Sequence, residues 1–253
     1  MTKIERKTNY NRYSMSIKEY FFYYSISIIG IIMIGILFYN RIILGFIFTP
    51  LSYYIVKERK KELLSKQKNE LNTQFKDAIY AISSALNAGY SVEMSFKEAY
   101  RDLSLIYINQ NTPILKELEY IVRQIDVNIP VENLLYDFAN RSGVEDIENF
   151  ADVFITCKKT GGDIIKVIRN TSRVIVEKIE IKREINIVIS SKKFEQKIMC
   201  LIPFGIILYL WVSSPGFLDV MYNTLGGMIT MTICLMVYLL SWVLSKKIME
   251  IEV

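Results

Sequence analysis

The sequence predicts an all-α integral membrane protein with four transmembrane helices and a cytoplasmic domain of six helices. Three observations predict this class. Of the 253 residues, 51% are hydrophobic and 23% are charged, which is typical of a chain that lies partly in a membrane and partly in water. Long uncharged stretches lie towards both ends of the chain. Between them, apolar residues recur at helical spacing, without the sustained period-two alternation that would predict a strand.

The N-terminal part predicts a charged cytoplasmic segment, residues 1–20, followed by a transmembrane hairpin, residues 21–56. Residues 21–39, FFYYSISIIGIIMIGILFY, have the length of a membrane-spanning helix and carry aromatic residues at both ends. Residues 42–56 are shorter and contain Pro50. We interpret them as the return leg of the hairpin, the alternative being a helix in the membrane interface. Because the first apolar stretch is too long for a secretory signal and no small-residue cleavage site follows, we expect it to stay as an anchor.

The C-terminal part predicts a second hairpin, residues 198–244, and a cytoplasmic tail, residues 245–253. Lys and Arg cluster before the first span, after the second, before the third and after the fourth, whereas the links within the hairpins carry only Arg41 and Asp219. Since Lys and Arg are retained on the cytoplasmic side, both termini and the middle of the chain are predicted to face the cytoplasm. An odd number of spans would not satisfy this pattern.

The middle of the chain, residues 57–197, is long enough for one domain of ordinary size. It contains 23 Lys and Arg against 21 Asp and Glu, so no nucleic-acid partner is expected. The run KERKK at residues 57–61 could alone suggest such a partner, but it directly follows a predicted span. We interpret it as a topology determinant that also contacts anionic membrane lipids.

Six helices are predicted in residues 57–197 because apolar residues form one-sided stripes with steps of three, four and seven. The stripes contain Leu64, Leu71, Phe75, Ala78, Ile82 and Ala85; Val92, Phe96, Ala99, Leu103 and Ile106; Leu115, Leu118, Val122 and Ile125; Val131, Leu134 and Phe138; Ile147, Phe150 and Phe154; and Ile164, Ile168, Ile175 and Ile179. The first helix is predicted to continue out of the second span, and the sixth to run into the third.

Glycine, proline and capping residues mark the ends of these helices. Gly89 follows the first stripe, where glycine adopts the left-handed conformation at least cost, and Ser91 is placed to cap the next helix. Pro113 and Pro130 are predicted in first turns, which tolerate proline. Gly143 is predicted to end the fourth helix.

The stretch CKKTGGDIIKVI, residues 157–168, combines two lysines, a glycine pair and an acid before a helical stripe. A phosphate-binding P-loop has its lysine after the glycines and follows a strand, whereas here the lysines come first and the flanking segments are predicted helices. We therefore predict a sharp corner, in which Gly161 ends the fifth helix while Gly162 and Asp163 begin the sixth. An anion bound at this helix start is the alternative.

Catalytic, metal-binding and cofactor-binding residues are not predicted, and we do not expect an enzyme. The chain has no histidine, which removes the commonest general base and the usual nitrogen ligand for zinc. The cysteines, Cys157, Cys200 and Cys234, are far apart and are interpreted as small apolar residues. A membrane-tethered enzyme would need a cleft with a base and perturbed acids, and nothing in the sequence singles one out.

Three short motifs occur in order in two segments of the predicted domain. The segments are ALNAGYSVEMSFKEAY, residues 85–100, and YDFANRSGVEDIENFADVFITCKKTGGDIIKVIRNTSRVIVEKI, residues 136–179. The motifs are a glycine-serine corner at residues 89–91, an Ala-x-Arg at residues 139–141 and a Gly-Gly corner at residues 161–162. Over roughly residues 74–203, the chain resembles the cytoplasmic helical domain of the type II secretion system F family, in particular its Tad-type pilus platform proteins.

The resemblance implies a platform protein in the cytoplasmic (inner) membrane of a bacterium. Such a platform couples a hexameric secretion ATPase in the cytoplasm to the extraction and stacking of pilin subunits, and family members are not known as enzymes. General-secretion members carry two copies of the domain, whereas this chain has one. A homodimer or a homologous platform protein is therefore expected to supply the second copy.

A metal site and a channel function are the remaining possibilities that the sequence raises. Some relatives hold a divalent cation through domain carboxylates, but here Glu145, Asp146, Glu148 and Asp152 are interpreted as a solvated face, and no metal site is predicted. The alternative to a platform is a small channel or transporter subunit with a regulatory helical domain. The predicted spans contain no Asp, Glu, Lys or Arg, which argues against an ion path.

Overall fold

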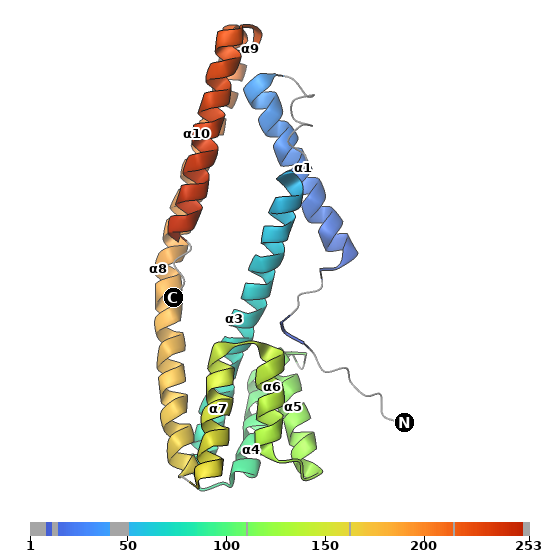
Figure 1. Ribbon diagram of the computed structural model, residues 1–253, viewed down its shortest axis with the longest axis vertical. Coiled ribbons are helices and arrows are strands. Elements are labelled where there is room, and N and C mark those ends of the chain that lie inside the picture. Colours follow the sequence, from blue (N-terminus) through green and yellow to red (C-terminus); the bar gives the residue numbers. More distant parts are fainter. Residues whose placement is uncertain are drawn as a thin grey trace. The chain divides into compact units, whose positions relative to one another are not determined.

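The computed structural model describes residues 9–11, 15–40, 51–109, 111–161, 163–214 and 216–249 (Figure 1). Every regular element in these residues is a helix, which confirms the predicted all-α class for the described part of the chain. The chain divides into two compact units. We call Met1–Ser14 with Lys61–Ile181 the central unit, and Met15–Lys60 with Lys182–Val253 the apolar unit.

Three helices in the described residues are long and apolar enough to cross a membrane. They are α1 (Ile17–Tyr39), the stretch Ile165–Ser213 of α8 (Ile164–Ser213), and the stretch Leu225–Ser245 of α10 (Leu225–Met249). A short helix, α9 (Asp219–Asn223), precedes α10. The predicted second span, residues 42–56, lies largely outside the described residues, although residues 51–56 begin α3 (Leu51–Asn87).

Side chains within the apolar unit join α1 to α8, α9 and α10. Phe38 of α1 and Phe204 of α8 have ring centroids 6.0 Å apart in an edge-on arrangement, and Leu235 of α10 is buried in the same cluster. The hydroxyl of Tyr222 in α9 donates a 2.8 Å hydrogen bond to the carbonyl of Leu37 in α1. The candidate spans of this unit therefore pack against one another through specific contacts.

The central unit has its own core. Its helices are α4 (Val92–Ile106), α5 (Pro113–Asp126), α6 (Val131–Ser142) and α7 (Glu145–Thr160), with the adjoining parts of α3 and α8. Helix α4 packs against α5, and α6 packs against α7. The ring centroid of Phe75 lies 6.1 Å from that of Phe138 and 5.7 Å from that of Phe150, so aromatic residues from three helices meet at the centre.

Most residues predicted on the apolar stripes are buried in this core. Leu64, Val92 and Val122 are only partly buried, and on α5 the position next to Val122 is buried instead, at Ile121. Ile106 was predicted inside the core but is 69% exposed, because α4 ends at this residue and no further turn packs it. The spacing thus identified the buried face of each helix but not the last residue of every stripe.

Helix α8 is a single helix of 50 residues that contains Pro203. At 1.5 Å per residue, this is about 75 Å of helix. Pro203 has no N–H to donate to the carbonyl of Met199 one turn earlier, yet the helix continues to Ser213. The predicted sixth helix and the predicted third span are therefore parts of one uninterrupted helix.

Candidate functional site

The first predicted corner joins α3 to α4. Gly89 has a φ of 92°, a conformation that glycine adopts without a Cβ penalty, and the N–H of Tyr90 donates to the carbonyl of Ala85 at the end of α3. Ser91 is the N-cap of α4, and its hydroxyl accepts a 3.3 Å hydrogen bond from the N–H of Met94. Backbone and capping hydrogen bonds thus form this corner.

The second predicted corner joins α7 to α8. Gly161 ends α7 with a φ of 69°, and its N–H donates to the carbonyl of Cys157. Asp163 accepts a 3.0 Å hydrogen bond from the N–H of Lys166, which caps the start of α8. Gly162 lies outside the described residues. The free N–H groups of the first turn of α8 are thus partly satisfied by a carboxylate of the chain itself.

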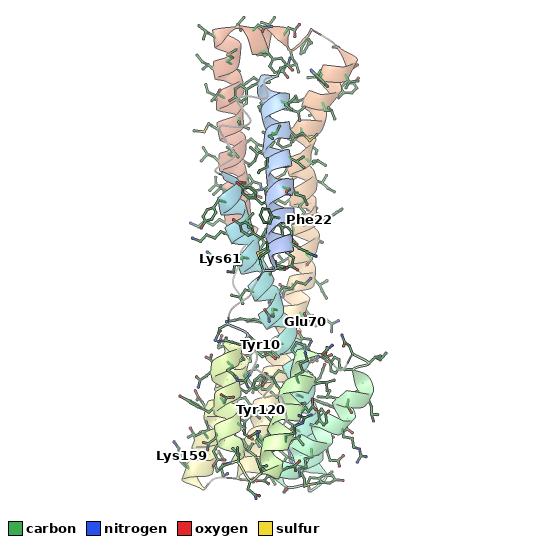
Figure 2. All side chains as sticks on the ribbon, turned by 90° about the vertical axis from the view of Figure 1, so that its right-hand side faces the viewer. Tyr10, Phe22, Lys61, Glu70, Tyr120 and Lys159 are labelled. Carbon is green, nitrogen blue, oxygen red and sulfur yellow. The ribbon has the colours of Figure 1, made fainter. Side chains whose placement is uncertain are left out.

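Of the two lysines before this corner, Lys158 pairs with a carboxylate of the chain, which does not favour a phosphate-binding role. The Lys158 ammonium donates a 2.6 Å hydrogen bond to Glu132 at the start of α6. Burial alone would raise the pKa of Glu132, but the hydrogen bond from Lys158 lowers it below its usual value. The contact ties α7 to α6, and Lys159 is an exposed side chain at the end of α7 (Figure 2).

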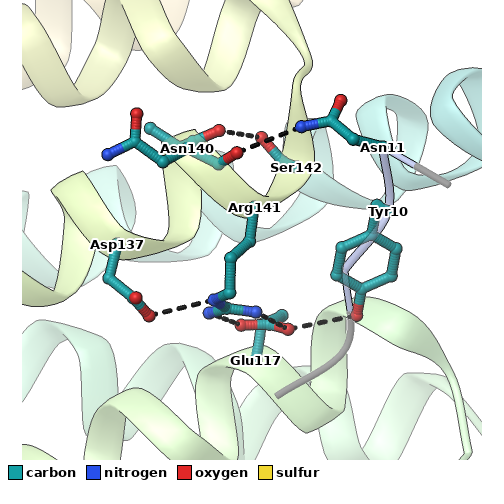
Figure 3. Close-up of polar contacts among 8 residues, drawn as sticks. Tyr10, Asn11, Glu117, Asp137, Asn140, Arg141 and Ser142 are labelled. Carbon is teal, nitrogen blue, oxygen red and sulfur yellow. Dashed lines mark hydrogen bonds and ion pairs between the residues drawn. The ribbon is translucent and has the colours of Figure 1, made fainter.

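A buried ionic network lies at the Ala-x-Arg motif, near the C-terminal end of α6 (Figure 3). The Arg141 guanidinium donates from Nη1 and Nη2 to both carboxylate oxygens of Glu117 on α5, at 2.8 and 2.6 Å, and from Nε to Asp137 at 2.9 Å. Only 12% of the Arg141 side chain and 6% of the Glu117 side chain are exposed. The guanidinium also lies over the ring of Tyr120, with Cζ 6.0 Å from the ring centroid.

This network is suited to holding helices in register rather than to catalysis. Burial would lower the pKa of Arg141, but its hydrogen bonds and charge interactions with Glu117 and Asp137 raise that pKa above its usual value. The guanidinium therefore stays charged and cannot act as an acid or base. Each carboxylate oxygen of Glu117 can accept more than the one hydrogen bond that Arg141 donates to it, so the network has room for an additional hydrogen-bond donor.

The additional donor is Tyr10, which the sequence analysis did not identify. Its hydroxyl donates a 3.1 Å hydrogen bond to Glu117, and its side chain is 2% exposed (Figure 3). Glu117 was missed as well, although a signal existed. It falls on the apolar stripe of α5, at helical steps of three and four between the buried residues Ile114 and Ile121, and an acid on such a face indicates a buried partner.

A second polar cluster involves the acids at the start of α7. Asp146 was predicted on a solvated face, and that prediction is wrong: only 3% of the residue is exposed. It accepts 2.7 Å hydrogen bonds from Lys178 on α8 and from Asn72 on α3. Glu145, at 3.2 Å from Lys178, completes the cluster. Glu148 and Asp152 are exposed and lie outside it.

Lys178 supplies the positive charge at this cluster. Its hydrogen bond to Asp146 is the main reason that its pKa is raised above the usual value. The Lys178 ammonium thus occupies the position beside Asp146 that a metal ion would need. Among the described residues, no group of three or more Cys, Asp and Glu side chains is arranged to hold a metal ion.

No family model, curated protein or solved structure matches this chain.

Proposed function

We propose that this chain is an inner-membrane platform protein of a Tad-like type IV pilus or type II secretion machine, and that it couples a cytoplasmic ATPase to pilin assembly. The observation that carries the proposal is the position of the three motifs. Each lies at a helix end or beside one, in a unit of helices that is flanked in the sequence by apolar helices long enough to cross a membrane.

Each motif has a structural task that suits such a platform. The corners at Gly89 and Gly161 reverse the chain between neighbouring helices, and Arg141 joins α6 to α5 through a bidentate ion pair. A unit held by such contacts can be pushed or rotated as one body, because its helices are fixed to one another by packing and by buried hydrogen bonds.

The proposed membrane arrangement has four spans with both termini in the cytoplasm. The three apolar helices support three of the spans, and residues 42–56 would provide the fourth. The proposed cytoplasmic domain then comprises six helices within residues 57–197. Helices α3 and α8 have 37 and 50 residues, and each leads from an apolar segment of the sequence into this domain without a break. This continuity supports mechanical coupling between an ATPase and the spans.

Binding of the ATPase tests the proposal. The detergent-solubilised full chain should retain a purified secretion-type ATPase encoded beside its gene, in a pulldown that an unrelated four-span protein does not reproduce. The channel alternative would instead give ion flux in proteoliposomes containing the chain alone. Flux without ATPase binding would contradict the proposal.

A further inference from the structure

The N-terminal segment Asn9–Asn11 is bound on the surface of the central unit like a short peptide ligand. It has no helix of its own, yet Tyr10 belongs to the buried core of the unit. Its hydroxyl reaches Glu117, as described above, and its backbone N–H donates a 2.9 Å hydrogen bond to the carbonyl of Arg141. Tyr10 therefore contacts both residues of the buried ion pair, Glu117 through its side chain and the backbone of Arg141 through its main chain.

Asn11 is recognised next to Tyr10. Its side-chain amide donates a 3.1 Å hydrogen bond to the carbonyl of Asn140 (Figure 3). Its side-chain oxygen accepts a 2.8 Å hydrogen bond from Lys68 on α3. Lys68 also donates to the carbonyl of Gly143 at 2.8 Å. Within the segment itself, the N–H of Asn11 donates to the side chain of Asn9 at 2.9 Å, which forms a tight turn.

These contacts fall on the C-terminal end of α6, where helix carbonyls have no partner within the helix. The N–H of Tyr10 and the amide of Asn11 satisfy the carbonyls of two consecutive residues there, Arg141 and Asn140. Gly143 leaves room for this approach, because a Cβ at that position would lie 1.7 Å from the Asn11 side-chain oxygen. The helix end thus recognises the tyrosine and the following asparagine by shape and by hydrogen bonding.

Departure of the segment would leave no buried charge without a partner. Glu117 would keep both of its hydrogen bonds to Arg141, and water could bind the two carbonyls at the end of α6. The segment belongs to no helix, so its departure would break no helix of the central unit.

We propose that the end of α6, with Glu117 and Lys68, is a binding site for a short peptide turn that contains the sequence Tyr-Asn, and that Asn9–Asn11 occupies it as a releasable strap of the same chain. Only five residues, 12–16, join the strap to α1. Release of the strap would end the contacts of Asn9–Asn11 with Glu117 and with the end of α6. The proposed strap does not depend on the ATPase or on any other partner of the central unit.

Limited proteolysis of the full chain in detergent tests the strap. Trypsin cleaves after Lys7 and Arg12, which flank the strap in the sequence, and cleavage requires several residues on each side to enter the protease extended. Docking of Asn9–Asn11 should therefore protect both bonds. Tyr10→Phe removes one hydrogen bond to a charged group and should speed cleavage about tenfold, and Tyr10→Ala about a hundredfold, because cleavage follows the released fraction.

A matched control is Tyr136→Ala, which removes a 58% exposed tyrosine from α6 and should leave both rates unchanged. Equal rates for the wild type and Tyr10→Ala would overturn the proposal. So would simultaneous cleavage throughout residues 61–181 in both Tyr10 variants, since Tyr10 would then be an ordinary core residue. Protection that disappears on dilution would mean that the strap docks on a second copy, which contradicts its assignment to the same chain.

Binding of a peptide supplies an independent readout. A fluorescent peptide TNYNR, residues 8–12, should bind saturably to the Tyr10→Ala chain and more weakly to the wild-type chain, whose own strap competes for the site. The peptide TNANR should not bind. Absence of saturable binding of TNYNR to the Tyr10→Ala chain, or equal binding of both peptides, would overturn the specificity for tyrosine.

Discussion

Replacement of Gly161 by valine should destabilise the central unit through the backbone alone. Gly161 has a φ of 69°, and a Cβ built there meets nothing within 4 Å, so crowding contributes no cost. An L-residue in this left-handed conformation costs about 1–2 kcal/mol, and a β-branched residue is at the upper end or above it. For a unit of this size, the melting temperature should fall by about 5–10 °C.

Thermal unfolding of the full chain in detergent, followed by far-UV circular dichroism, measures this effect. Gly161→Asn is a matched control and should cost less, because asparagine tolerates the left-handed region. Lys158→Gln and Lys159→Gln should each change stability by less than about 1 kcal/mol, since they remove at most a partly exposed ion pair. If Gly161→Val melted like the wild type, or if ATP raised the melting temperature, the interpretation of this stretch as a corner would be refuted.

Further predictions concern the Arg141–Glu117 ion pair, the Lys158–Glu132 ion pair and the folding of residues 57–197 alone. Arg141→Ala should cost about 3–5 kcal/mol by thermal unfolding, because it leaves Glu117 buried without its partner, and Arg141→Lys should recover only part of this loss. An Arg141→Ala chain as stable as the wild type would contradict the role given to the pair. Because the pKa of Glu132 is lowered in the folded chain, its pairing stabilises above an unfolded pKa of about 4.3 and is lost as the pH falls below that value. Lys158→Gln should therefore flatten the acid side of a plot of melting temperature against pH, and an unchanged slope would count against the pairing. Residues 57–197 expressed alone should give a far-UV spectrum dominated by helix; a spectrum dominated by strand or coil would contradict the predicted domain.

Helix ends could be predicted from the sequence because they depend on neighbouring residues. Ser91 caps the helix that follows it directly, and Gly143 and Gly161 end helices in the left-handed conformation that glycine favours. The buried faces could be predicted for a similar reason, since helical spacing places apolar residues on one side. These rules operate within one or two turns of helix, and no knowledge of distant contacts is needed.

The polar contacts of the site depend on residues far apart in the sequence, and spacing did not reveal them. Tyr10 and Glu117 are 107 residues apart, and Asp146 and Lys178 are 32 apart. Asp146 follows an exposed acid in a first helical turn, so its local pattern is the same as that of a solvated residue. In the folded chain it is buried and contacts Asn72 on α3 and Lys178 on α8. Tyr10 had no helical pattern around it from which burial could be inferred.

A break in α8 tests the proposed coupling most directly. Ser190 and Ser191 are exposed, and their hydroxyls bond only to carbonyls of the preceding turn at Asn186 and Val188, so an insertion between them removes no contact to another helix that the structure records. Four glycines inserted there should interrupt the helix, whereas four alanines should extend it. In the host bacterium, the glycine variant should reach normal levels in the membrane and still bind the ATPase, but assemble no pili, while the alanine variant should retain pili. Pilus numbers equal to the wild type in the glycine variant would contradict force transmission through α8 and leave the chain only a passive scaffold.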